Sequence, residues 1–296
     1  VLPVAALRDQ VRDLHRQRRA CRFAEVATEL PGLIRNLHTT LATGTDHGEV
    51  LDLAVYLHVH VTRLWLVHAG APADLVRRAV FLIRRLAQER DEAATLSVTS
   101  FAVADALLAG GAFPLAQAVL DSLTLPPTSA DTAGLVSQIT VTHALAAVLD
   151  GRPGDVAAPM EAAAELAERF GATGETDSRG FVFGPVDAGI IRMWLALEAD
   201  EPDQAVSVAH DVDPECHPFP VNRAHYWIQY GRALTQLRGR WADAVAALRT
   251  AENLFPTKVR RDPMVRDVLT ELLTRARRDA VGRELRGMAY RAGLSV

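Results

Sequence analysis

Apolar residues recur at steps of three and four positions along almost the whole chain. Leu75, Ala79, Leu82, Ile83 and Leu86 are one example of this spacing, which places side chains on one face of a helix. The alternation of apolar and polar positions that is typical of strands is nearly absent. The pattern therefore predicts an all-α fold.

The helical runs are separated by turn segments that look alike. These segments begin at Gly70, Gly110, Gly151, Asp200 and Gly239, so the steps between them are 40, 41, 49 and 39 residues. Four segments carry a proline where the first turn of a helix accepts one, because the missing N–H would have no helical partner there. These prolines are Pro72, Pro114, Pro153 and Pro202. A period near 40 residues is typical of repeated helix hairpins.

We expect seven helix pairs within a single domain over residues 1–296. The expected helices are 3–19 with 22–42, 47–69 with 72–90, 92–109 with 113–124, 132–149 with 154–170, 184–199 with 202–211, 220–238 with 241–255, and 263–278 with 280–292. One pair alone cannot bury its apolar surface, so successive pairs have to stack, as they do in an α-solenoid. A plain multi-helix bundle is the alternative fold.

The sixth pair has the clearest order of large, small and helix-breaking residues. Its first helix carries Trp227, Tyr230, Gly231 and Leu234, and its second carries Ala244, Leu248 and Ala251 before Pro256. This order resembles the tetratricopeptide repeat, in which small residues lie where two helices approach closely and the proline ends the second helix. The resemblance implies a tetratricopeptide-like α-solenoid that winds into a right-handed superhelix, with residues 263–292 as its C-terminal capping pair.

The single long step contains a Gly-rich insertion at residues 171–187. Loops that interrupt a regular scaffold often carry function, but a Gly-rich segment is also a simple connector. Phe181 and Phe183 suggest that the insertion folds back onto the helices. It lacks the lysine and the spacing of a phosphate-binding loop.

Composition and charge exclude several classes of protein. The formal net charge is −4 and the sequence pI is about 6.2, so there is no overall basic field to attract nucleic acid. Two cysteines cannot form a disulfide framework, which favours the cytoplasm. The apolar run from Leu51 to Ala69 contains several charged or ionisable side chains, so we expect a protein that does not cross a membrane. The start at Val1 has no signal-peptide pattern and suggests a processed form or a fragment.

No residue pattern indicates catalysis, a cofactor or a metal site. His58 and His60 are two positions apart on a helix and therefore point to different faces. His210, Cys216 and His217 have no ligand spacing, and we expect a solvated turn there. Arginine clusters such as Arg16, Arg18 and Arg19 are expected on solvated helix faces, with phosphate contact as the alternative. We therefore expect a protein that is not an enzyme.

The end of the chain carries the most distinctive resemblance. Residues 255–269 read FPTKVRRDPMVRDVL, and residues 277–293 read RRDAVGRELRGMAYRAG. Together with Phe181–Pro185, these segments resemble the tetratricopeptide-like sensor domain of actinobacterial, Streptomyces-type regulators of the Xre/Cro helix-turn-helix family. The resemblance implies a ligand-sensing and dimerisation domain of a transcriptional regulator. The chain itself contains no helix-turn-helix, so DNA binding is expected only through a part of the regulator outside it. The alternative function is a protein-interaction scaffold without a small ligand.

The resemblance also implies where a small molecule or peptide would bind. In tetratricopeptide folds the first helix of each pair lines a concave groove. The residues that this register places in the groove are Tyr56, His60, Arg63, Asp105, Asp187, Trp194, His225, Gln229 and Arg232, with Phe181 and Phe183 as a lid. Two arginines among aromatic residues suit an anionic or peptide-carboxylate ligand. Alternatively, Arg63 and Arg232 pair with Asp105, Asp187 or Glu198 and only hold neighbouring helices together.

The last helix pair predicts how the chain assembles. Val281, Leu285, Met288, Ala289 and Leu294 form an apolar stripe with little sequence beyond it to cover it. A regulator that reads two DNA half-sites matches a two-fold dimer. We therefore expect a homodimer through the C-terminal helices; the alternative is that the stripe folds back onto the preceding pair.

Overall fold

The computed structural model describes residues 2–44, 46–123, 128–170, 177 and 179–295. Every regular element in these ranges is helical, which confirms the all-α prediction. The described structure divides into two compact units, Val1–Val67 with Ala71–Gly184, and Pro185–Val296 with His68–Gly70. The units divide between Gly184 and Pro185, inside the Gly-rich insertion, and the single domain over residues 1–296 stays a prediction.

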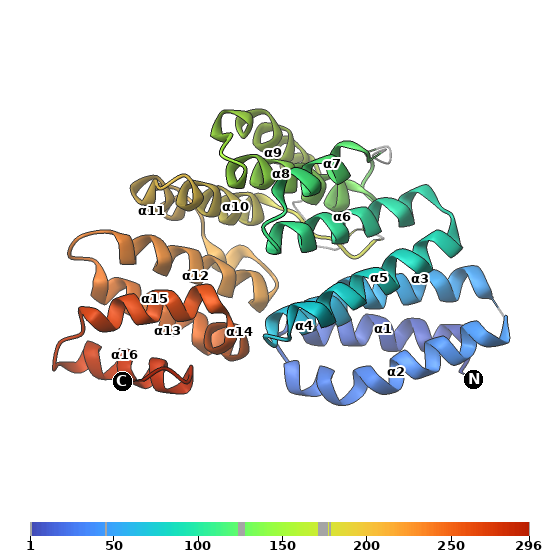
Figure 1. The fold of residues 1–296 in the computed structure, drawn as a ribbon, viewed down its shortest axis with the longest axis horizontal. Helices are drawn as coiled ribbons and strands as arrows, with labels where there is room; N and C mark the ends of the chain where they lie inside the picture. Colours follow the sequence, from blue (N-terminus) through green and yellow to red (C-terminus); the bar gives the residue numbers. More distant parts are fainter. Residues whose placement is uncertain (1, 45, 124–127, 171–176, 178, 296) are drawn as a thin grey trace. The chain divides into compact units, whose positions relative to one another are not determined.

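The first unit contains four of the expected helices before residue 91 and four after it; the expected helix 47–69 is divided into α3, η1 and α4. The elements are α1 (Val4–Arg19), α2 (Phe23–Thr43), α3 (His47–Leu57), the π-helical η1 (His58–Arg63), α4 (Leu64–His68), α5 (Ala73–Arg90), α6 (Ala93–Ala109), α7 (Phe113–Asp121), α8 (Ala133–Leu149), the 3₁₀ turn η2 (Pro153–Asp155) and α9 (Ala157–Phe170). Successive helices pack on each other, and the first helices of successive pairs, α1, α3, α6 and α8, also contact one another in that order (Figure 1).

The second unit is also a chain of neighbouring helices. Its elements are α10 (Pro185–Glu198), α11 (Pro202–His210), the 3₁₀ turn η3 (Pro214–Cys216), α12 (Pro220–Gln236), α13 (Trp241–Leu254), α14 (Pro256–Arg261), α15 (Pro263–Thr274) and α16 (Ala280–Arg291). The short helix α14 was not predicted. Pro256 ends α13, as expected, but it also begins α14, because the first helical position tolerates a residue without an N–H.

The repeated turns behave as their residue types require. Gly151 and Gly239 have φ values of +77° and +78°, a left-handed conformation that glycine adopts without steric cost. Pro202 is the first residue of α11, whereas Pro72 directly precedes α5 and Pro153 starts the 3₁₀ turn η2. Pro72 and Pro202 therefore mark the start of a helix to within one position, whereas α9 begins four residues after Pro153.

Close packing of small residues joins α12 to α13. Gly231 and Ala244 are buried, and a Cβ atom on Gly231 would lie 2.9 Å from Cγ of Leu248. Such a contact is closer than packed carbon atoms allow. The small residue at position 231 is thus what lets the two helices approach, as the sequence indicated.

The C-terminal stripe is covered by the chain itself. Leu285, Met288 and Ala289 are at most 1% exposed and pack in the core of the second unit, with Val281 and Leu294 partly buried against it. This is the alternative in which the stripe folds back onto the preceding helices, because α13 and α15 pack against α16. The stripe therefore gives no argument for a dimer, and the homodimer remains a prediction.

Candidate functional site

A group of buried polar side chains lies between α1, the α3–η1 segment and the end of the insertion. We call it the basic cluster. It consists of His15, Arg18, Arg19, Tyr56, His60 and Arg63, of which all but Tyr56 are at most 7% exposed. Burial of so many ionisable groups is costly unless each finds a partner. The partners of these residues therefore decide what the cluster is for.

Hydrogen bonds fix the protonation of the two histidines. Nε of Arg19 donates to Nε2 of His15 at 2.8 Å, so the proton of His15 is on Nδ1. That Nδ1 donates to the Tyr56 hydroxyl at 2.6 Å. His60 uses Nε2 to donate to the carbonyl oxygen of Arg179 at 2.6 Å. Burial is the main reason that the pKa values of His15 and His60 are well below the usual histidine value, so both rings are neutral at pH 7.

This arrangement leaves one donor of the cluster unused. The Tyr56 oxygen accepts from His15, and its own proton has no acceptor among the described residues. The Tyr56 ring packs against both histidine rings, with centroids 4.7 Å from His60 and 5.3 Å from His15. Tyr56 is therefore held in place while its hydroxyl proton is free to bind another group.

The described end of the insertion closes one side of the basic cluster. Asp177 accepts backbone N–H bonds from Leu135, Arg179 and Phe181 at 2.8 to 3.0 Å, which ties the insertion to the start of α8. Gly180 lies directly against the ring of Tyr56, and its carbonyl accepts from Nη2 of Arg19 at 2.7 Å. The prediction that the insertion folds back onto the helices is confirmed for this part.

Arg18 is buried without a compensating charge. It is 5% exposed, its Nε has no hydrogen-bond partner, and no described residue forms an ion pair with it. Burial, followed by the charge of Arg19, lowers the pKa of Arg18 to about 9, and Arg63 adds to the effect. The guanidinium therefore stays charged at pH 7, in surroundings that disfavour the charge. Nε of Arg63 is also buried without a partner.

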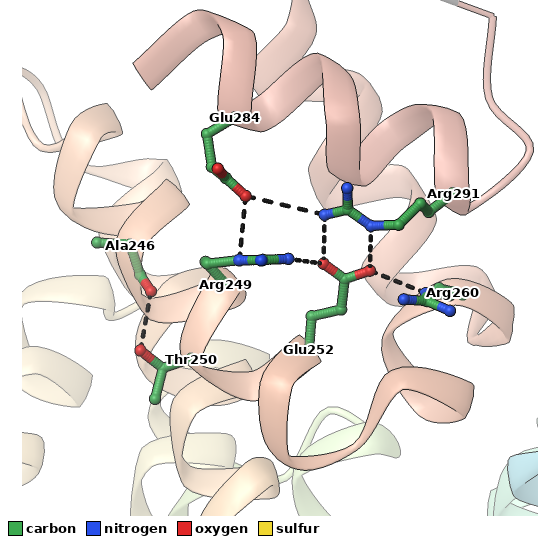
Figure 2. Close-up of polar contacts among 7 residues, drawn as sticks. All are labelled: Ala246, Arg249, Thr250, Glu252, Arg260, Glu284 and Arg291. Carbon is green, nitrogen blue, oxygen red and sulfur yellow. Dashed lines mark hydrogen bonds and ion pairs between the residues drawn. The ribbon is translucent and has the colours of Figure 1, made fainter. Parts of the chain in front are cut away.

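The second unit shows how the same chain compensates a buried charge. The Glu252 side chain is 1% exposed, and its carboxylate accepts from Arg249, Arg260 and Arg291 at 2.6 to 2.9 Å (Figure 2). Burial alone would raise the pKa of Glu252, but the arginine hydrogen bonds outweigh burial and lower it to about 2. Three arginines thus surround the buried carboxylate of Glu252, whereas no carboxylate among the described residues forms an ion pair with Arg18.

A cavity of about 180 Å³ opens beside the basic cluster. Its walls combine Val11, Leu53, Val55 and Val98 with Tyr56, His60 and Thr95, and with the charged residues Arg8, Arg12, Glu49, Asp52 and Arg179. The carboxylates in these walls are already paired, Glu49 with Arg8 and Asp52 with Arg90. Arg12 has no ion-pair partner among the described residues. The cavity is therefore lined by apolar side chains together with an excess of positive charge.

Six of the predicted groove residues belong to the first unit. Tyr56, His60 and Phe181 come together, with the His60 and Phe181 rings 4.6 Å apart. Arg63 pairs with Asp105, which was the structural alternative for that arginine. Phe183 is 4% exposed and, like Phe181, is packed as part of the core.

The other five predicted residues lie in the second unit and make internal contacts there. Asp187 is buried and receives hydrogen bonds from His217 and Asn222. Arg232 and Trp194 both donate to Glu198, at 2.8 and 3.0 Å, which again is the structural alternative. His225 and Gln229 lie on α12, and Oε1 of Gln229 is buried without a partner.

The expectation that the arginines near the end of α1 lie on a solvated face was wrong for two of them. Arg18 and Arg19 are buried rather than on a solvated face, although Arg16 is exposed. Arg18 is in phase with the apolar residues Leu7, Val11 and Leu14, at steps of four, three and four, and this spacing could have identified it. In the turn that was expected to be solvated, His210 and Cys216 are exposed, whereas His217 is 4% exposed and pairs with Asp187.

The described residues contain no group of three histidine, cysteine or carboxylate side chains placed to hold a metal ion. The segment His47–His68 is long and apolar enough to cross a membrane. More than half of its apolar window is buried against other helices, and it carries His60 and Arg63, so it is packed as a core helix of the first unit.

Comparison with known proteins gives no relative from which a function could be transferred. No family model, no curated protein and no solved structure matches this chain.

Proposed function

We propose that this chain is a ligand-sensing domain and that its ligand is a small molecule with one anionic group and an apolar body. The apolar body of the ligand would occupy the cavity that Tyr56 and His60 line, and its anionic group would extend from there to Arg18, which does not itself line the cavity. The observation that carries this proposal is Arg18, a buried guanidinium without a hydrogen bond at Nε and without a counter-ion among the described residues.

Energetics support an anionic ligand. Replacing a buried charge by an apolar residue of similar size is often neutral or stabilising, so folding does not require a charge here. An arginine kept in an unfavourable place is typical of residues whose partner arrives on binding. Arginine also offers planar, paired donors that suit a carboxylate.

The cavity supports both the size and the character of the ligand. A cavity of about 180 Å³ is slightly larger than one that holds benzene. The free hydroxyl proton of Tyr56 and the unpaired Arg12 supply donors at its wall, while Val11, Leu53 and Val98 supply apolar contact. The positive charges of Arg18 and Arg19 act on both Tyr56 and His60.

We further propose that the fold is a tetratricopeptide-like, right-handed solenoid and that the chain serves a cytoplasmic, dimeric transcriptional regulator. The tetratricopeptide-like repeat is supported by two observations. The helices α1, α3, α6 and α8 contact one another in that order, and α12 approaches α13 closely at Gly231. The regulator role rests on the resemblance of residues 255–293 and 181–185. The second candidate, an interaction scaffold, is favoured by an apolar groove described below.

Thermal unfolding of the purified chain with three carboxylates tests the ligand proposal. The probes are benzoate, cyclohexanecarboxylate and hexanoate, with benzamide as the uncharged counterpart of benzoate and inorganic phosphate as an anion without an apolar body. We expect at least one carboxylate to raise the unfolding temperature in a saturable manner, and benzamide to have no effect. The variant R18M should lose this response, while R232M, which removes a paired arginine of the second unit, should keep it.

Three outcomes would overturn the proposal. The first is no response to any of the carboxylates. The second is an equal response of R18M and the unaltered chain, which would place the ligand elsewhere. The third is stabilisation by phosphate alone, which would exclude the apolar body.

A further inference from the structure

An apolar groove lies on the surface of the first unit, away from the residues of the basic cluster. It is formed by α5, α6 and α7 and has a volume of about 480 Å³. Phe81 and Leu115, which line it from α5 and α7, are 68% and 62% exposed. We call it the α5–α7 groove. Val80, Val103 and Leu107 form more of its apolar wall.

Phe81 is on the side of α5 that does not pack in the core. The buried residues of this helix are Ala79, Val80, Ile83, Leu86 and Ala87. By contrast, Phe101 and Phe181, which pack in the core of the same unit, are 8% and 7% exposed. A large exposed aromatic side chain beside an exposed leucine is typical of an interaction site rather than of a free surface.

The charges at the α5–α7 groove are of one sign. Arg77 and Arg84 line it, and no carboxylate does. Neither arginine has an ion-pair partner among the described residues, whereas the neighbouring Arg78 contacts Asp74 at 3.9 Å. Apolar surface between two unpaired cations is complementary to an amphipathic segment with acidic edges.

We infer that the α5–α7 groove binds an acidic amphipathic helix of a partner protein. Arg77 and Arg84 are seven residues apart, which is about 10 Å along the helix axis. A partner helix that lies along α5 therefore needs two acidic residues seven positions apart, with apolar residues between them that contact Phe81 and Leu115. The binding of this partner is independent of the proposed ligand cavity, because the two sites share no lining residue.

Fluorescence anisotropy with labelled helical peptides tests this inference on the intact chain. The acidic peptide has glutamates seven positions apart and leucines at the third and fourth positions between them; in the basic peptide, lysines replace the glutamates. We expect the acidic peptide to bind in 0.15 M salt and the basic one to bind at least tenfold more weakly. The variant R77E/R84E should reverse this preference, and F81S should weaken acidic-peptide binding at least tenfold.

The variant R78E/R85E is the matched control. It makes the same change of charge at the same spacing on the same helix, but its residues do not line the α5–α7 groove. It should change the affinity by less than twofold. Equal losses in R77E/R84E and R78E/R85E would overturn the inference by showing general charge attraction. Unchanged binding in F81S would overturn it as well. Concentration-dependent self-association that F81S abolishes would identify a second copy as the occupant instead.

Discussion

At the scale of single residues, Gly180 is the tightest fit in the basic cluster. Its φ is +85°, and a Cβ atom there would lie 2.6 Å from Cε2 of Tyr56. Alanine at this position would add backbone strain and push on a ring that the cluster holds in place. We expect G180A to lower the free energy of unfolding by about 3 kcal/mol, as measured by urea unfolding.

Gly151 provides the control for this prediction. Its φ is +77°, but nothing lies within 4 Å of an added Cβ. G151A should therefore cost about 1 kcal/mol, from backbone strain alone. If the two variants lose equal stability, the contact between Gly180 and Tyr56 contributes nothing.

Replacing Arg18 should stabilise the chain, in contrast to the two glycine variants. Because its charge is buried without compensation, R18M should raise the free energy of unfolding of the unliganded chain by about 2 kcal/mol. R232M leaves Glu198 without its ion pair and should lower that free energy by about 1 kcal/mol. A clear loss of stability in R18M, measured by urea unfolding without added anions, would contradict the view that Arg18 is held for a ligand.

At the scale of elements, the π-helical segment η1 makes the first unit sensitive to mild acid. Burial, with a contribution from His38, lowers the pKa of His58 to about 4, and the pKa values of His15 and His60 are lowered as well. The unfolded chain therefore binds more protons than the folded chain below about pH 6.5, so stability falls as the pH falls. For His58 alone the loss between pH 6.5 and pH 5 is about 2 kcal/mol.

Urea unfolding at pH 7 and at pH 5 measures this effect. H58Q should lose less stability between the two pH values than the unaltered chain. H210Q, which changes an exposed histidine, should lose as much as the unaltered chain. An identical pH dependence in H58Q would show that η1 does not bury a neutral histidine.

The helices around Glu252 should lose stability at a lower pH than the histidine-containing segment η1. The pKa of Glu252 is lowered from 4.5 to about 2, so its contribution to stability is complete above pH 4.5 and is lost as the pH falls toward 2. E252Q should lower the free energy of unfolding at pH 7 by about 3 kcal/mol, because three arginines lose their shared anion. E284Q, at a carboxylate that is 43% exposed, should cost less than about 1 kcal/mol. If E252Q and E284Q lowered the free energy of unfolding equally, as measured by guanidinium unfolding, the buried position of Glu252 would add nothing to the stability that its ion pairs provide.

At the scale of the whole molecule, sequence spacing was sufficient for the helices but not for the buried charges. Periodic apolar residues, turn residues and prolines placed the helices within a few residues, because local backbone preference and amphipathicity act over short ranges. The short helix α14 was missed because Pro256 both ends one helix and starts the next. The closing of α16 onto α13 depends on tertiary packing, which the stripe of Leu285 and Met288 does not reveal by itself.

The candidate site was only partly predictable for the same reason. Tyr56 and His60 were predicted from the helix register, and Phe181 was predicted from its position in the insertion. The burial of Arg18 follows from its spacing with Leu7, Val11 and Leu14 and was overlooked. That α1 packs against Tyr56 could not be predicted, because His15 and Tyr56 are 41 residues apart in the sequence. Whether Arg63 binds a ligand or a neighbour depended on the position of Asp105, which is set by the packing of α6.

The central claim is that Arg18 is held without a partner until an anion binds. The most direct test follows the Nε–H signal of Arg18 by nuclear magnetic resonance in a chain labelled with ¹⁵N-arginine, assigned by its absence in R18M. During titration with the carboxylate that stabilises the chain most, we predict a saturable downfield shift of this signal, with the same midpoint as the thermal stabilisation. The account would be contradicted if the Arg18 signal stayed unchanged while the chain was saturated with the ligand.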